Sequence, residues 1–174
     1  MRGLAKGEPN LKILVLSDSH RCVGAMYDAA MLEKPDVIFH LGDHVSDAQE
    51  LSYALDPIDF YEVRGNCDFG AQAPETILTE LAGVRFFLTH GHLFGVKSGP
   101  GAAIAHAARC DADILLFGHT HEPYSETLDA GESAGDVTLS RPLHVFNPGS
   151  LGYGDSFGVL TVRRGVPMLS FGTL

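Results

Sequence analysis

Cysteine is scarce in this chain of 174 residues. Cys22, Cys67 and Cys110 are its only cysteines, and they are widely separated. So few and so scattered cysteines exclude a disulfide framework and a cysteine-rich zinc site. A reducing, cytoplasmic compartment is the simplest interpretation.

Basic residues are also few. The chain has 12 lysines and arginines against 22 aspartates and glutamates, and its formal net charge is −10. The summed field repels long polyanions, which excludes a general DNA or RNA coat and predicts no stable nucleic-acid complex. A partner that carries phosphate must therefore be held locally.

Long apolar segments are absent. The first ten residues lack the apolar stretch of a signal peptide, and no later run approaches the roughly 18 residues that span a membrane. We therefore expect no export signal and no membrane partner, and residues 1–10 are expected to form a flexible tail.

The composition that is present is that of a globular domain. Hydrophobic residues make up 45% of the chain and charged residues 20%, which is close to the average for soluble proteins. The length suits a single domain with a packed core, which we place over residues 1–174.

Short apolar runs alternate with helical spacings along the chain, which predicts an α/β fold. The predicted strands are 11–16, 37–41, 60–63, 75–81, 84–88, 114–117, 137–139, 143–146, 158–162 and 168–171, and the predicted helices are 24–33, 47–55 and 101–109. The later strands follow an antiparallel pattern, so mixed sheets are expected. The segment 125–136 is rich in Gly, Ser, Glu and Asp, and we expect a solvated loop or hairpin tip that is the best candidate for disorder.

Metal-capable side chains follow five separate apolar runs. They are Asp18 and His20, Asp43, Asn66, His90, and His119 with His121. Ligands bind outside the carboxyl ends of strands in open α/β sheets, so these side chains are expected to meet at one rim. Glycines border them, at positions where the backbone must turn sharply or approach an ion closely.

The mixture of carboxylate, amide and imidazole suits divalent Mn, Fe, Zn, Ni or Co. The ligand count is too large for one tetrahedral zinc, and two metal ions are the natural solution. Two divalent ions opposed by the carboxylates of Asp18 and Asp43 leave a charge of about +2, which attracts a phosphate ester.

The residues resemble the calcineurin-like metallophosphoesterases through five motifs in chain order. They are D-S-H at 18–20, G-D-H at 42–44, G-N-C-D at 65–68, T-H-G-H at 89–92 and G-H-T-H at 118–121. The cysteine in the third motif, the string T-H-G-H-L-F-G from Thr89 and N-P-G-S from Asn147 are most similar to the small YfcE-type bacterial and archaeal phosphodiesterases.

The resemblance implies a four-layer α/β/β/α sandwich of two mixed β-sheets. It also implies that Asp18, His20 and His121 hold one metal ion, that Asn66, His90 and His119 hold the other, and that Asp43 bridges them. Manganese is the first choice of metal, and a bridging hydroxide would be the nucleophile. The implied activity is hydrolysis of small phosphodiesters, with Asp43, Asn66, His90 and His44 as catalytic residues.

Cys67 departs from the pattern of the larger family, in which many members carry a histidine there as the acid that protonates the leaving group. A thiol is a poor substitute for imidazole, so leaving groups that need little protonation, such as phenolates, should be favoured. His44 or His92 is the alternative acid. Cys67 itself is either a functional group of the pocket or an inert small side chain.

Arg21 and Arg64 flank ligands, and each either contacts phosphate or pairs with Asp47, Asp68 or a surface carboxylate. Asp68 orients a ligand or the site loop, or acts as an Asx-turn residue. His40 is expected in the core or beside a residue that it orients.

Phe94 and Tyr153 either line a substrate pocket or pack between protomers of a homo-oligomer, and 147–150 is expected to form a turn near the site. Two other functions compete with a diesterase. One is a phosphomonoesterase or protein phosphatase, and the other is a non-catalytic metal-binding interaction module on the same fold, like the retromer subunit.

Overall fold

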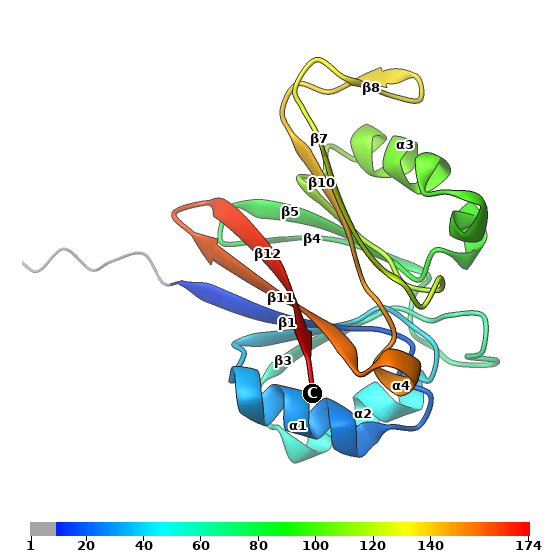
Figure 1. The fold of residues 1–174 in the computed structure, drawn as a ribbon, viewed down its shortest axis with the longest axis vertical. Helices are drawn as coiled ribbons and strands as arrows, with labels where there is room; N and C mark the ends of the chain where they lie inside the picture. Colours follow the sequence, from blue (N-terminus) through cyan, green and yellow to red (C-terminus); the bar gives the residue numbers. More distant parts are fainter. Residues whose placement is uncertain (1–9) are drawn as a thin grey trace, which may run out of the picture.

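A computed structural model describes residues 10–174 as two five-stranded sheets packed face to face between helices (Figure 1). The tail that the sequence predicts over residues 1–10 lies outside the described residues, except for Asn10. Within the described part of the chain, no helix is long and apolar enough to cross a membrane.

The first sheet has the strand order β12-β11-β1-β2-β3. Its strands are β1 (Leu11–Leu16), β2 (Val37–His40), β3 (Asp59–Glu62), β11 (Ser156–Arg163) and β12 (Val166–Thr173). β1, β2 and β3 run parallel, with Leu14 opposite Ile38. β11 pairs antiparallel with the other edge of β1, and β12 pairs antiparallel with β11. β1 is buried from Ile13 to Leu16 and β2 along its whole length, as expected for mainly apolar strands covered on both faces.

The second sheet has the order β4-β5-β6-β10-β7. Its strands are β4 (Thr76–Leu81), β5 (Val84–Thr89), β6 (Ile114–Leu116), β7 (Pro123–Leu128) and β10 (Leu143–Pro148), and β8 (Ser133–Ala134) pairs with β9 (Val137–Thr138) in a separate hairpin. Ala82 and Gly83 join β4 to β5 with φ angles of 50° and 77°. Positive φ at both positions is the geometry of the tight hairpin that the sequence predicts.

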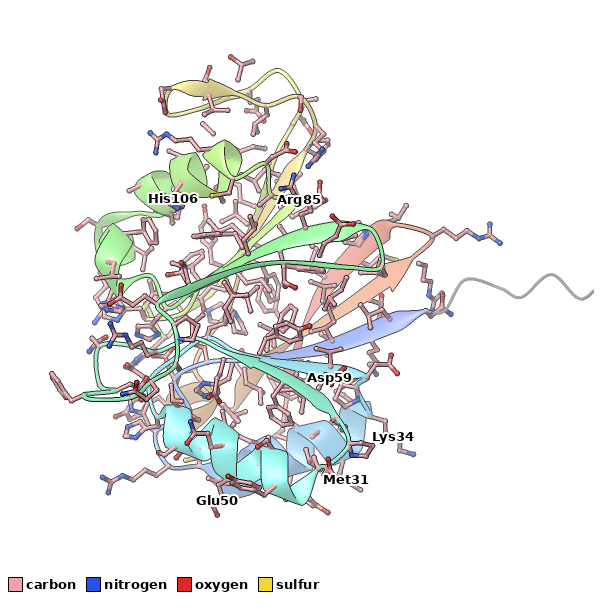
Figure 2. The ribbon with its side chains drawn as sticks, turned by 180° about the vertical axis from the view of Figure 1, so that it is seen from behind. Met31, Lys34, Glu50, Asp59, Arg85 and His106 are labelled. Carbon is pink, nitrogen blue, oxygen red and sulfur yellow. The ribbon has the colours of Figure 1, made fainter. Side chains whose placement is uncertain are left out.

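The helices form the two outer layers. α1 (Val23–Glu33), α2 (Val45–Ala54) and α4 (Leu151–Gly154) cover the first sheet, and α3 (Gly101–Arg109) covers the second after the 3₁₀ turns η1 (His92–Phe94) and η2 (Val96–Ser98). Figure 2 shows Met31 and Glu50 on the outer surface of one helical layer and His106 on α3 at the other. One apolar cluster joins the sheets and one lies under each helical layer, which confirms the four-layer α/β/β/α sandwich.

Two local predictions are only partly correct. In the segment 125–136, residues 125–128 are not a loop, because β7 pairs with β10 along its whole length, from Pro148 opposite Pro123 to Leu143 opposite Leu128. Pairing with a distant strand outweighs the local preference of Ser and Glu for loops. Residues 129–136 do lie in turns and in the hairpin of β8 and β9. Helix α2 begins at Val45, two residues before the predicted start at 47, with His44 as its N-cap.

Candidate metal centre

The strand ends bring the predicted side chains to one edge of the molecule, the side opposite to the one at which β1 begins in Figure 1. Backbone hydrogen bonds join the loops there: the amide of Asp18 donates to Gly42 O at 3.0 Å, and the amide of Gly118 donates to His90 O at 3.1 Å. The first bond links the ends of β1 and β2, and the second links the ends of β5 and β6. The amide of His119, which follows β6, donates to Asp18 Oδ2 after β1 at 3.1 Å, so both sheets contribute to the same rim.

One group of side chains consists of Asp18, His20, Asp43 and His121. One potential ligand atom from each lies within 4.8 Å of the others. His121 Nε2 is 3.1 Å from Asp18 Oδ1 and 3.5 Å from His20 Nε2. These atoms surround a single point that a cation can occupy.

A second group surrounds His90 Nε2. This nitrogen is 3.2 Å from Asn66 Oδ1, 3.2 Å from His119 Nδ1 and 3.4 Å from Asp43 Oδ1. Asp43 therefore belongs to both groups, as the bridging role implied by the resemblance requires. All seven predicted ligand positions are brought together.

Two details show that these residues fit metal ions. His90 Nδ1 lies 2.7 Å from the carbonyl oxygen of Leu41, which assigns the ring proton to Nδ1 and leaves a lone pair on Nε2. Oδ1 of Asp18 is buried and accepts no hydrogen bond within residues 10–174, whereas its Oδ2 accepts from Ser17 Oγ and from the amide of His119. A buried carboxylate oxygen without a partner is costly, and a cation would satisfy it.

The protonation states favour cation binding. Burial lowers the pKa of His20, and burial together with His90 and Lys97 lowers the pKa of His119 to about 4. Burial alone would raise the pKa of Asp43, but His90 and the amide of Cys67 outweigh it and hold that pKa below its usual value. His20 and His119 are thus neutral and Asp43 is ionised at neutral pH, the forms in which these groups bind metals.

The backbone at these positions is unusual. Five of the seven residues have left-handed φ angles, a conformation that few non-glycine residues adopt. They are Asp18 at 52°, His20 at 45°, Asp43 at 57°, His119 at 68° and His121 at 62°. Asp and His tolerate this region better than most side chains, and such strain is concentrated at functional sites.

A buried polar network, which the sequence interpretation missed, supports the loops that carry Asp18 and Asp43. Ser19 Oγ donates to Asp47 Oδ2 at 2.8 Å and lies 3.1 Å from Nε2 of the fully buried His40. The amide of Arg21 also donates to Asp47 Oδ2, at 2.7 Å. The sequence did offer one signal for this network, because serines stand on either side of Asp18 directly after a buried strand.

The N-P-G-S segment holds the site from the second sheet, in agreement with the turn predicted near it. Asn147 Nδ2 donates to the carbonyl oxygen of Gly118 at 3.0 Å, and Ser150 Oγ donates to that of Asp18 at 2.9 Å. Asp68 orients the site loop, because its two carboxylate oxygens accept from the amides of Val45 and Gly65.

The predicted substrate residues lie around the rim. Arg21 is exposed, and Arg64 pairs with the partly exposed carboxylate of Glu75 at 2.5 Å. The Cys67 thiol is exposed, and partial loss of hydration together with the carboxylate of Asp43 raises its pKa to about 11. This thiol is a poor proton donor.

Three further side chains lie close to the ligand groups. The ring of His44 is 5.1 Å from that of His20, and the ring of His92 is 5.4 Å from that of His90. Tyr153 is 70% exposed and stacks on His121 with the ring centres 5.2 Å apart, so it is available to a ligand at the site. Phe94 packs instead against Phe87 in the cluster under α3.

Two cavities open beside the ligand groups. One of about 320 Å³ includes Asn66 and His92 in its lining, together with Arg64, Phe69 and Glu75. The other, of about 600 Å³, includes Thr120, which lies between the two ligand positions His119 and His121.

A sandwich of two mixed sheets with carboxylate, amide and imidazole groups at one rim defines the metallophosphoesterase class. The chain belongs to the calcineurin-like phosphoesterase superfamily, whose domain model matches residues 11–165.

Relatives of similar length support the same class. A probable metallophosphoesterase, YsnB of Bacillus subtilis (strain 168), is 28% identical over 92% of this chain and 90% of its own length. Another from Mycoplasma pneumoniae is 32% identical over 80% of this chain and 79% of its own. The phosphodiesterase YfcE of Escherichia coli (strain K12) is 38% identical, but over 51% of this chain and 42% of YfcE.

Solved structures agree on the fold. A predicted phosphoesterase from Streptococcus pneumoniae TIGR4 matches with a TM-score of 0.71 and 26% identity, covering 95% of this chain and 90% of that one. Vacuolar protein sorting 29 from Cryptosporidium parvum matches with a TM-score of 0.68 at 16% identity, covering 95% and 98% of the two chains.

Proposed function

We propose that this protein is a cytoplasmic, metal-dependent phosphodiesterase that hydrolyses small phosphodiesters with two divalent ions, manganese first. The observation that carries the proposal is the pair of ligand groups that share Asp43, with a buried oxygen of Asp18 that accepts no hydrogen bond. Asp18, His20 and His121 would hold one ion, and Asn66, His90 and His119 would hold the other.

The chain's own residues prepare this site for a phosphate ester. Two carboxylates among otherwise neutral ligands leave an excess of positive charge once both ions are present. When bound, the ions would supply Lewis acidity that activates water and neutralises the charge of the phosphate. Arg21, at the exposed rim, is placed to meet an anionic substrate, whereas Arg64 is already paired with Glu75.

Two features support a diester rather than a monoester. Cys67 stands where a histidine acid would protonate a poor leaving group, so phenolate-like leaving groups are favoured. The two cavities beside the ligand groups also offer separate places for two ester substituents, at Asn66 and at Thr120. A monoester has one ester substituent and would occupy only one of the two cavities.

The test is hydrolysis of bis(4-nitrophenyl) phosphate by metal-stripped protein, with and without added Mn²⁺, with 4-nitrophenyl phosphate measured in parallel. We expect Mn²⁺ to restore turnover and the diester rate to exceed the monoester rate. A faster monoester reaction would indicate a phosphomonoesterase. Bound metal without turnover of either compound would indicate a non-catalytic interaction module.

A further inference from the structure

The larger cavity is lined by side chains that suit a flat ring. Its apolar lining consists of Val96, Pro100, Phe117, Pro123 and Tyr124. Phe117 and Tyr124 have ring centres 6.0 Å apart, and the Tyr124 hydroxyl donates to Glu126, which holds its ring in place. Aromatic and proline faces are the surfaces on which rings stack.

The rim of this cavity is polar but has no net charge. Lys97 and Glu122 contribute opposite charges, and Ser98 and Thr120 contribute hydroxyls. Within residues 10–174 Lys97 forms no ion pair, and its charge is close enough to lower the pKa of His119. The rim therefore offers hydrogen-bond donors and acceptors to a neutral polar group at the edge of the metal centre.

The volume and the lining of the larger cavity distinguish it from a site for phosphate alone. The volume of about 600 Å³ falls in the range of roughly 300–1,000 Å³ that small-molecule sites occupy. The smaller cavity, in contrast, is lined mainly by polar and charged residues, among them Arg64, Asp68 and Glu75, and its rings are the phenyl of Phe69 and the imidazole of His92. An aromatic substituent is therefore better accommodated beside Thr120.

We propose that this cavity binds a nucleoside, as the non-leaving ester group of a phosphodiester whose phosphate lies at the metal centre. The inference rests on the proposed function and deepens it by naming the substrate class. The base would lie between Tyr124 and the proline faces, and the rim hydroxyls, Lys97 and Glu122 would bond its polar edge and sugar. Ser98, in the exposed turn η2, then becomes a position that controls specificity.

The experiment compares two diesters that release the same 4-nitrophenolate: thymidine 5′-(4-nitrophenyl) phosphate and methyl 4-nitrophenyl phosphate. With Mn²⁺-loaded protein, we expect kcat/KM to favour the nucleoside ester by about tenfold, which corresponds to about 1.4 kcal/mol. Ser98→Trp, which fills the cavity from its rim, should abolish this preference. Ser133→Trp, a matched tryptophan on the exposed strand β8, should retain it.

Calorimetric binding of thymidine 5′-monophosphate and methyl phosphate provides a readout that is independent of turnover. We expect the nucleotide to bind wild-type protein about tenfold more tightly, and Ser98→Trp to lose this difference. Tyr124→Leu, which removes the stacking face, should reduce it as well. Equal affinities and an equal kcat/KM for both diesters would overturn the inference while leaving the diesterase intact. Failure to hydrolyse either diester would refute the proposed function, and binding would still decide the inference.

Discussion

Asp43 is the residue on which the two ligand groups depend. It lies among the atoms around Asp18, and its Oδ1 is 3.4 Å from His90 Nε2 and accepts the amide of Cys67 at 2.9 Å. It is 2% exposed and held in its ionised form. A single carboxylate thus contributes charge to both halves of the centre.

We expect Asp43→Asn to lose metal and activity together, with metal affinity falling at least about 100-fold, because a neutral amide removes one negative charge from both groups. Isothermal titration with Mn²⁺ and the bis(4-nitrophenyl) phosphate assay measure the two effects. Asp28→Asn, an exposed change on α1, is the matched control. An Asp43→Asn variant with full metal content and full rate would refute the bridging role.

At the scale of elements, the turns after the strands leave no space for larger residues. A Cβ built on Gly118 would collide with Ser17 Oγ and approach Asp18 Oδ2 to 2.9 Å. Gly118 also donates to His90 O and accepts from Asn147, so its backbone has few ways to move. The end of β6 is therefore packed directly against the end of β1.

Gly118→Ala should displace the loop that carries Asp18. We expect metal affinity to fall by about 10- to 100-fold, which is typical when residues that orient a metal ligand are changed. We also expect the free energy of unfolding to fall by about 1–3 kcal/mol, because the added methyl group overpacks the loop. Metal titration and urea denaturation measure these changes. Gly24→Ala, whose new Cβ meets nothing in α1, should leave metal affinity unchanged. Wild-type affinity in the Gly118→Ala variant would show that this contact does not position Asp18.

At the scale of the whole molecule, the buried His40 links stability to pH. Burial lowers its pKa to about 4. The nearby carboxylates of Asp68, Asp18 and Asp47 act in the opposite direction and raise this pKa, whereas His90 lowers it further. Its ordinary pKa is 6.5. Between these values the unfolded chain binds more protons than the folded one, so the free energy of unfolding falls as the pH is lowered.

From this group we expect a loss of about 2 kcal/mol between pH 8 and pH 5 in metal-free protein. His40→Gln, whose amide keeps a donor towards Ser19, should remove that part of the pH dependence. Urea denaturation of the wild type and of His40→Gln between pH 8 and pH 5 measures how the free energy of unfolding of each depends on pH. The value of each protein at pH 8 is its reference. Parallel pH dependences would show that His40 is not held neutral in the folded state.

Much of the fold followed from local patterns in the chain. Apolar runs such as LKILVL predicted β1, and the turn signals at Ala82–Gly83 predicted the β4–β5 hairpin, because strand and turn preferences act over a few residues. The strand at Pro123–Leu128 was missed, since its local composition is polar and its conformation is decided by pairing with β10.

The sequence by itself determined which side chains are available for metal chemistry, because five motifs place Asp, Asn and His directly after apolar runs. Only the tertiary structure decided that Asp43 contacts both groups, that Oδ1 of Asp18 lacks a partner, and that a large cavity opens beside Thr120. These features depend on contacts such as the one between Asp18 and His119, which are far apart in the chain. Local patterns carry no information on such distances, which are set by how the two sheets pack.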